Sequence, residues 1–137
     1  MDMKIDSMLN RLFVYGTLTP GGSNFGLLRH LGGNWQQASL LGYLDSEGWG
    51  HCEGYPAIIP HLEGNLVPGW MLETENLAEF WQALDSFEGA CYERVLVSIT
   101  TESGEMQQAH TYILAGEELR DSILAALLPQ GSPVTPK

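Results

Sequence analysis

The sequence predicts an α+β fold in which about six strands form a strongly curled sheet flanked by two or three helices. Apolar runs of strand length are joined mostly by short turns, and proline and glycine interrupt two of them, as expected where a sheet bends. Two later segments change to the periodicity of amphipathic helices. With 137 residues and 44% hydrophobic composition, the chain has the length of one domain with a buried core.

The first predicted strand covers residues 12–15 and ends in a turn rich in small residues. Its apolar side chains leave no solvated face, so we expect it to be buried on both sides. Gly16 follows, and a glycine here lets the backbone approach a ligand closely or adopt a positive φ. The N–H groups from Gly16 to Leu18 can then converge on an anion or a carbonyl oxygen. The alternative is a strand that simply ends in a loop.

The next elements are a short helix and a longer strand. Ser23 can cap a helix over residues 24–31, which Gly32 ends, and residues 35–44 alternate as a strand. Residues 45–54 form a polar, glycine-containing loop that is long enough to be a lid or a rim.

Two bent strands follow. The prolines in residues 55–60 are incompatible with a central ladder position, so this strand should lie at an edge or a bulge. Residues 66–73 contain the pair Pro68-Gly69 and should form a second bent strand. Such bends are what a strongly curled sheet or a small barrel requires.

The second half of the chain predicts a helix followed by a hairpin. Apolar residues at helical spacing, with Asn76 as N-cap, Glu79 completing a capping box and Gly89 as the end, predict a helix over residues 77–88. Its apolar stripe consists of Leu77, Phe80, Trp81 and Leu84.

Residues 92–101 and 106–114 predict a hairpin, and residues 117–128 predict a second amphipathic helix carrying Leu119, Ile123, Ala126 and Leu127. We therefore assign residues 1–128 to a single domain. The proline-rich tail, residues 129–137, has too little to bury and is expected to be disordered.

The composition argues against several classes of partner. Six Lys and Arg against seventeen Asp and Glu give a net charge of −11, which repels nucleic acid and anionic membranes. The sequence contains no transmembrane stretch and no signal-peptide core, so we expect a cytoplasmic protein. Cys52 and Cys91 lack CxxC spacing, and we expect both to be buried and reduced. The four histidines lack metal-binding spacing, and no pattern indicates an oligomeric state.

One carboxylate lies on the apolar face of a predicted helix. Glu88 follows Leu77 by eleven residues and returns to within about 20° of its direction. Burial and the C-terminal helix dipole both raise a carboxyl pKa, which makes a glutamate basic enough to take a proton near neutrality. The alternative is that the last turn frays and Glu88 enters water. Asp85 points away from the stripe and is expected to be an ordinary solvated residue or a local cap partner.

An ordered set of short motifs resembles the γ-glutamylcyclotransferase-like family, with the γ-glutamylamine cyclotransferase type and its small bacterial members as the most similar relatives. The set runs from about Leu12 to Leu114. Each tripeptide alone is weak, but the early Tyr-Gly-Thr-Leu and the late Leu-Asp-x-x-Glu-Gly make it fairly specific. The matching motifs are Phe13-Val14-Tyr15-Gly16-Thr17-Leu18, Gly42-Tyr43-Leu44, Tyr55-Pro56-Ala57, Val67-Pro68-Gly69, Leu84-Asp85-Ser86-Phe87-Glu88-Gly89, Tyr92-Glu93-Arg94 and Ala109-His110-Thr111-Tyr112.

The resemblance implies a cyclotransferase fold, a small mixed β-barrel flanked by helices. It also implies a reaction in which the α-amine of a γ-glutamyl group attacks its own γ-carbonyl and releases an amine and 5-oxoproline. Glu88 would be the general acid/base. The residues that would bind substrate are Tyr15, Gly16, Thr17, Leu18, Tyr92 and Tyr112. No cofactor or metal is required, because the attack is intramolecular and is accelerated by proximity.

Several alternatives remain open at this point. Tyr92 and Tyr112 are equally well explained by core packing, and Arg94 by an ion pair with Glu88 or Glu93 or by a position on a strand face. The loop at residues 45–54 is longer and more acidic than expected for the family, where the leaving amine would sit, so its identity does not transfer. A non-catalytic domain that binds a small metabolite or a protein is the alternative function.

Overall fold

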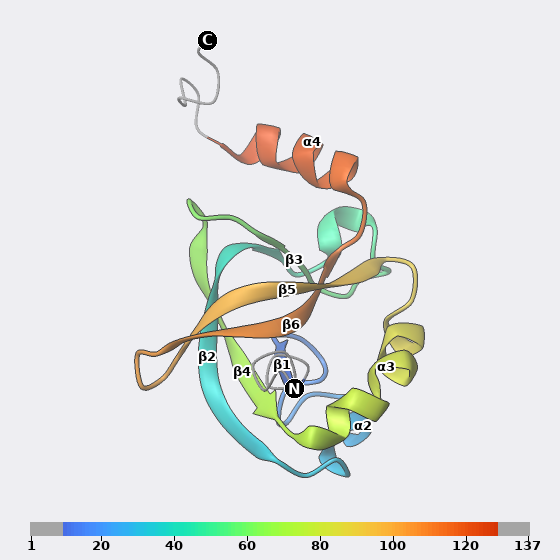
Figure 1. Ribbon diagram of the computed structural model, residues 1–137. Coiled ribbons are helices and arrows are strands. Elements are labelled where there is room, and N and C mark those ends of the chain that lie inside the picture. The colour runs from blue at the N-terminus through green and yellow to red at the C-terminus, as the bar shows by residue number, and fades with distance from the viewer. Residues whose placement is uncertain (1–9, 129–137) are drawn as a thin grey trace.

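The computed structural model describes residues 10–128 and contains a small closed β-barrel with an extra strand and three α-helices (Figure 1). Five strands close the barrel in the order β2-β4-β1-β6-β5, because β5 pairs back onto β2, and β3 adds to the free side of β2. The strands are β1 (Arg11–Val14), β2 (Asn34–Asp45), β3 (Ala57–Pro60), β4 (Asn65–Glu73), β5 (Tyr92–Thr101) and β6 (Met106–Leu114). The predicted fold class is confirmed.

The sheet is mixed. β1 pairs antiparallel with β4 and parallel with β6, and the other pairs are antiparallel. β3 pairs with β2 alone, so the predicted edge position of the proline-containing strand is confirmed. Gly69 is needed where β4 crosses β1, since a Cβ there would collide with the backbone carbonyl of Val14 and the ring of Phe13. This close approach explains why glycine occupies this point of β4.

The helices lie outside the barrel. α2 (Gly26–Arg29) and α3 (Trp81–Glu88) are on one side, and α4 (Glu117–Leu127) lies beyond one end, with short 3₁₀ segments η1 (Gly48–Gly50) and η2 (Glu75–Glu79) in the connections (Figure 1). No helix among residues 10–128 combines the length and apolar character needed to cross a lipid bilayer.

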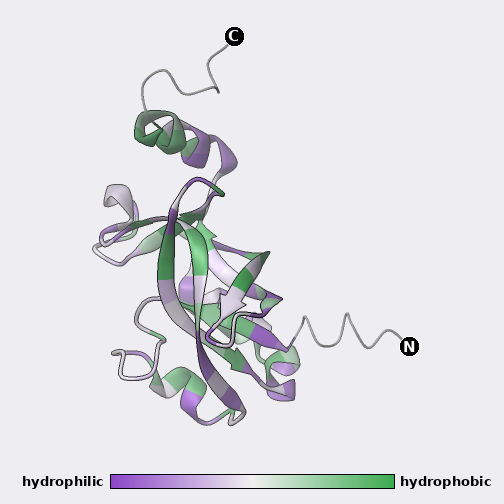
Figure 2. Ribbon diagram, turned by 90° about the vertical axis from the view of Figure 1, so that its left-hand side faces the viewer, coloured by the Kyte–Doolittle hydropathy of each residue, from purple (hydrophilic) through white to green (hydrophobic). Residues whose placement is uncertain are grey.

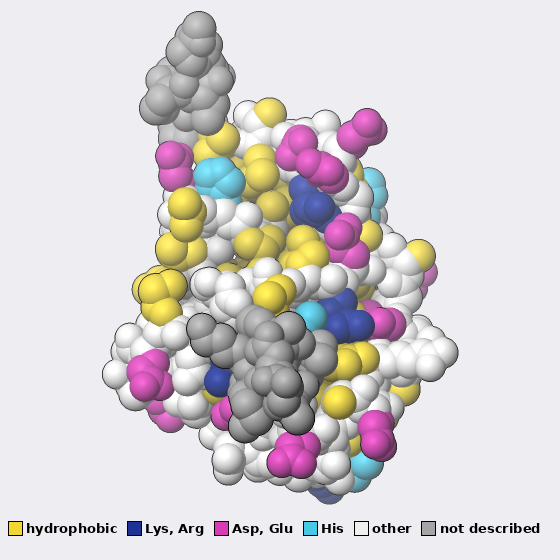
Figure 3. All heavy atoms as spheres, viewed as in Figure 1, with side chains coloured by type: hydrophobic (Ala, Val, Ile, Leu, Met, Phe, Trp, Pro, Cys, Tyr) yellow, Lys and Arg dark blue, Asp and Glu magenta, His cyan; other side chains and the backbone are white. Residues whose placement is uncertain are grey.

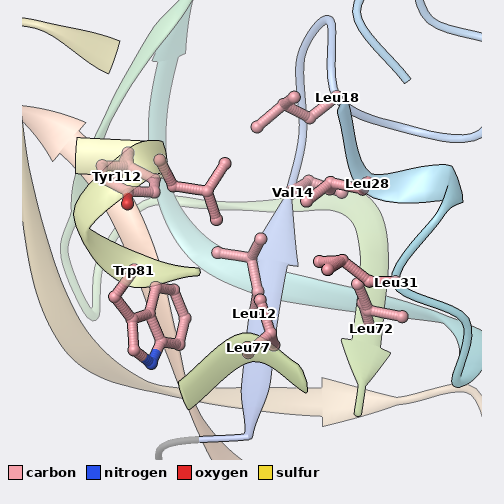
Figure 4. Packing of buried hydrophobic residues seen from close by; sticks show 10 residues of the cluster. Leu12, Val14, Leu18, Leu28, Leu31, Leu72, Leu77, Trp81 and Tyr112 are labelled. Carbon is pink, nitrogen blue, oxygen red and sulfur yellow. The ribbon is translucent and has the colours of Figure 1, made fainter. Parts of the chain in front are cut away.

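β1 is buried on both faces, as predicted. Leu12 and Val14 face the helices and pack with Leu28 of α2 (Figure 4). Leu84 of α3 belongs to the same cluster. Phe13 faces the barrel interior, where a second set of side chains packs. That interior set is completed by Ala38, Leu40, Ile58, Val67, Met71, Ile99, Ala109 and Ile113.

The predicted helix over residues 77–88 is divided in two. η2 and α3 are separated by Phe80, whose φ of −108° and ψ of −7° depart from the values of a regular α-helix. The N-cap is Thr74 rather than Asn76, because the buried Thr74 hydroxyl accepts a hydrogen bond from the Asn76 N–H at 3.3 Å. The Asn76 side chain instead donates to the carbonyl of Leu31 at 2.8 Å. Predicting one capped helix was therefore wrong in detail.

α4 is more exposed than its pattern predicts. Its first turn is hydrophilic and its second half hydrophobic (Figure 2). Leu119 and Ile123 pack partly against the barrel, but Leu127 is 41% exposed and no residue of the helix is fully buried. The tail predicted to be disordered, residues 129–137, lies outside the described residues.

Candidate active site

A cavity of about 730 Å³ opens where β1 ends, between the loop that follows β2 and the end of α3. All the residues predicted for the site contribute to its lining. They are Tyr15, Gly16, Thr17, Leu18, Glu88, Tyr92 and Tyr112. The structure thus brings together side chains that lie up to 97 residues apart in the sequence, as the hydrogen bond from Tyr15 to Tyr112 demonstrates.

Glu88 is the last residue of α3 and lies at the wall of this cavity. The helix continues through Glu88 before Gly89 ends it at φ 79°, so the last turn does not fray. Within residues 10–128 its carboxylate has no hydrogen bond and no ion pair, and burial raises its pKa from 4.5 to about 7. Near neutral pH this carboxyl can therefore both accept and release a proton.

Three tyrosines surround the cavity and donate their phenolic hydrogens to protein oxygens. Tyr15 donates to the carbonyl of Tyr112, Tyr92 to the carbonyl of Pro56, and Tyr112 to Asp85, each at 2.6 Å. Desolvation is the main cause that raises the pKa of each phenol, to about 12 for Tyr92, and the charge of Glu88 adds to each rise. All three remain neutral at physiological pH.

The turn after β1 lines the cavity and is held by its own hydrogen bonds. The carbonyl of Gly16 accepts from the N–H and hydroxyl of Thr19 at 3.2 and 2.8 Å, and Asn24 donates to the carbonyl and the hydroxyl of Thr17 at 2.8 and 2.9 Å. These bonds fix the turn. The N–H groups of Gly16, Thr17 and Leu18 have no acceptor anywhere in the described chain, so they are available to a ligand oxygen.

The loop after β2, residues 46–56, forms the rim. At the start of the loop the Asp45 carboxylate accepts a hydrogen bond from the N–H of Trp49 at 2.7 Å. At the end of the loop the Tyr92 hydroxyl donates to the carbonyl of Pro56. Trp49 and Glu53 adopt a positive φ of 55°, which is unusual for residues other than glycine. His51, Glu53 and Tyr55 all reach the cavity lining.

The prediction of two reduced cysteines is wrong. Cys52 of the rim and Cys91, which follows α3, form a disulfide with a Cα–Cα distance of 5.7 Å. The rim folds back onto the end of α3, which brings together thiols that are 39 residues apart. A spacing of this kind carries no local signal, which is why the pattern of the sequence did not reveal the bond.

Two further expectations are corrected. Asp85 is not an ordinary solvated residue, because it accepts from Tyr112 and from Arg94. Arg94 pairs with Asp85 at 2.9 Å rather than with Glu88 or Glu93, and Glu93 pairs instead with Arg120 at 2.8 Å. The pair joins side chains from α3 and β5, so no spacing within one element could have indicated it.

The cavity is acidic and carries no fixed positive charge. Within residues 10–128 its lining includes two carboxylates, Glu53 and Glu88, but no Lys or Arg. On the face shown in Figure 3, Asp and Glu side chains are more widespread than Lys and Arg side chains. The basic side chains on this face lie beside acidic ones. No group of three or more His, Cys, Asp or Glu able to hold a metal ion occurs in the described part of the chain.

Comparisons with known proteins agree with this architecture. YkqA from Bacillus subtilis superposes with a TM-score of 0.61 at 27% identity, over 77% of this chain and 35% of YkqA, so this chain spans about a third of that protein. An AIG2-like protein from Mus musculus superposes with a TM-score of 0.59 at 26% identity, over 80% of each chain. A structure described as a γ-glutamyl cyclotransferase shares the fold, with a TM-score of 0.51 at 19% identity over 77% of this chain and 66% of the other.

A search among curated proteins gave no match. The family model described as "Gamma-glutamyl cyclotransferase, AIG2-like" matches residues 12–131, which is most of the sequence and includes every residue of the cavity lining. The chain therefore belongs to the AIG2-like γ-glutamyl cyclotransferase family.

Proposed function

We propose that this protein is a γ-glutamyl cyclotransferase that releases 5-oxoproline and an amine from a γ-glutamyl amine or a small γ-glutamyl peptide. The observation that carries the proposal is the pairing of Glu88, a carboxyl with a pKa of about 7, with unused backbone donors across one cavity. Family membership supports the same reaction class.

The first step is removal of a proton from the substrate. The α-amine of the γ-glutamyl group has a reference pKa of about 8, is mostly protonated at pH 7 and cannot attack in that form. The Glu88 carboxylate takes this proton. Its pKa lies close enough to that of the amine for the transfer to be nearly balanced in free energy.

The second step is ring closure. The nitrogen lone pair attacks the γ-carbonyl carbon, and the electron pair of the C=O bond moves onto the oxygen. In this proposal the N–H groups of Gly16, Thr17 and Leu18 stabilise the oxyanion, each contributing about 3 kcal/mol if they act as known oxyanion-hole donors do. Because attack is intramolecular, holding the glutamyl chain in a folded geometry removes much of the barrier.

The last step breaks the bond to the leaving amine. Glu88 returns the proton that it took to the departing nitrogen. The regenerated carboxylate then takes the second proton from the attacking nitrogen, which is now part of the ring, and later releases this proton to solvent. The oxyanion reforms its carbonyl as the C–N bond breaks, which yields 5-oxoproline and a neutral amine. The single carboxyl of Glu88 thus serves as base and then as acid.

The test is to incubate the protein with a panel of γ-glutamyl amines and peptides and to measure 5-oxoproline. We expect turnover of at least one compound and a loss of at least about 100-fold in Glu88→Gln, which keeps the shape of the side chain but cannot carry the proton. Glu79→Gln, an exposed position on η2, is the matched control and should retain full activity.

The alternative function, a non-catalytic domain that binds a small carboxylate-bearing metabolite or a protein, predicts a different outcome. Such a domain would bind 5-oxoproline but would turn over no member of the panel. Turnover that survives Glu88→Gln would also contradict the proposed mechanism.

A further inference from the structure

Asp85 is the centre of a hydrogen-bonded cluster behind the cavity. Its Oδ1 accepts from Arg94 Nε at 2.9 Å and from the Tyr112 hydroxyl at 2.6 Å, and its Oδ2 accepts from Arg94 Nη2 at 3.2 Å. The two contacts with Arg94 form a bidentate ion pair, whose planar geometry restrains both side chains more than a single contact would.

Arg94 is itself held in place from several sides. Its guanidinium carbon lies 4.5 Å from the centre of the Trp81 ring, and its Nη1 lies 3.4 Å from His110 Nδ1. The ring of Trp81 lies 5.0 Å from that of His110. Because Arg94 on β5 is paired in register with Tyr112 on β6, this arrangement is fixed to the wall of the barrel.

The cluster connects two parts of the cavity that belong to different elements. Asp85 lies one turn before Glu88 on α3, and its carbonyl accepts from the N–H of Gly89 at 3.1 Å, which closes the last turn of the helix. Tyr112 lines the cavity, donates to Asp85, and accepts at its backbone carbonyl from Tyr15. The position of Glu88 is thus tied to that of two cavity tyrosines.

Asp85 and Arg94 do not themselves line the cavity. They are therefore placed to act on the site only through the residues that they hold. The pair also carries no net charge, since Arg94 hydrogen-bonds to Asp85 and holds the pKa of that carboxyl below its ordinary value of 3.8.

We propose that Asp85 and Arg94 form a clamp that positions Glu88 and Tyr112 for cyclisation, and that both are positioning residues rather than catalytic ones. The inference rests on the proposed function, because cyclisation is the reaction that the clamp would serve. The geometric claim is that the clamp fixes the end of α3 against β5 and β6.

The experiment measures the initial rates of 5-oxoproline release for Asp85→Asn, Arg94→Met and the double variant. Arg94→Met keeps an apolar stem against Trp81, and Asp85→Asn keeps an oxygen that can accept from Tyr112. We expect kcat to fall about 10- to 100-fold in each single variant, as for a misplacement of about 1 Å, while KM changes much less. The double variant should be no slower than the slower single variant, because the two residues act as one unit.

The matched control is another ion pair between an arginine and a carboxylate, here with a single contact. Arg11 and Glu73 are joined at 3.3 Å between β1 and β4, and neither residue lines the cavity. Glu73→Gln removes that pair and should leave kcat within about twofold of the parent, since surface ion pairs contribute little.

A second readout does not depend on turnover. Titration of the Glu88 carboxyl by carbon-detected NMR should give a midpoint near 7 in the parent and in Glu73→Gln. Tyr15, Tyr92 and Tyr112 interact with Glu88 and are neutral at this pH, and His51 and Glu53 share the cavity lining with it. Burial is the cause of the raised pKa of Glu88, so the midpoint reports the burial of its carboxyl. Clamp variants should titrate closer to 4.5 as the end of α3 loosens into solvent.

These two readouts separate the possible failures. If the parent turns over no γ-glutamyl compound, the proposed function fails, and the NMR midpoint alone still decides whether the clamp exists. If folded clamp variants keep both the parental midpoint and the parental kcat, the clamp is refuted. Should Arg94→Met fail to fold, Arg94→Lys replaces it, because lysine keeps the charge but cannot form the bidentate pair.

Discussion

Burial of Glu88 should lower the free energy of unfolding at the pH values at which its carboxyl is ionised. A rise of its pKa from 4.5 to about 7 corresponds to about 3 kcal/mol, at 1.36 kcal/mol for each pH unit between the unfolded and folded values. Below pH 4.5 the group is protonated in both states and costs nothing. Between pH 4.5 and 7 the unfolded state loses its proton first, so stability falls, and above pH 7 the full cost applies.

Replacing Glu88 by glutamine removes this cost. We expect urea titration to show that Glu88→Gln gains stability relative to the parent as the pH rises. The difference between their free energies of unfolding should be about 3 kcal/mol larger at pH 8 than at pH 4.5. Glu79→Gln, at an exposed position, should change stability by less than about 0.5 kcal/mol at both pH values. A difference between parent and Glu88→Gln that does not vary with pH would mean that the carboxylate is fully hydrated, and the reasoning about its basicity would be refuted.

Three other predictions follow from named contacts. The kcat/KM for 5-oxoproline release should rise with pH through an acidic limb near 7, since Glu88 must be ionised to accept a proton; a flat profile from pH 5 to 8 would contradict this. Reducing the Cys52–Cys91 disulfide with a dithiol should lower the free energy of unfolding by about 4 kcal/mol, the loop-closure value for a separation of 39 residues, and an unchanged urea midpoint would count against the bond. Gly69→Ala should destabilise the barrel by about 1–3 kcal/mol because a Cβ collides with the Val14 carbonyl, and a thermal melt with no loss would show that β4 can move away.

Local patterns predicted the parts of the fold that depend on local physics. The hairpin of β5 and β6 was predicted with the bounds that the structure has, because its strands are long and its turn is short. The edge position of β3 follows from prolines that cannot donate a ladder hydrogen bond. The position of Glu88 on an inward face follows from helical geometry, and it holds although the helix is broken at Phe80.

What the sequence did not reveal depends on contacts between distant segments. The N-cap moved to Thr74 because its hydroxyl is buried beside the carbonyl of Leu31, 43 residues away in the sequence. The disulfide and the pair between Asp85 and Arg94 depend on how the rim and α3 pack against the barrel. No periodicity within one segment contains that information, because each partner alone is also compatible with a solvated surface.

The way in which residues 46–56 are attached has a consequence for engineering. The segment is secured near its start by Asp45, midway by Cys52 and at its end by Pro56, so the stretches between these points can be exchanged without altering strand pairing. Randomised libraries limited to these stretches would reshape the mouth of the pocket while Glu88 keeps its place at the end of α3. Variants that accept substrates with other leaving amines could then be selected with little risk to folding.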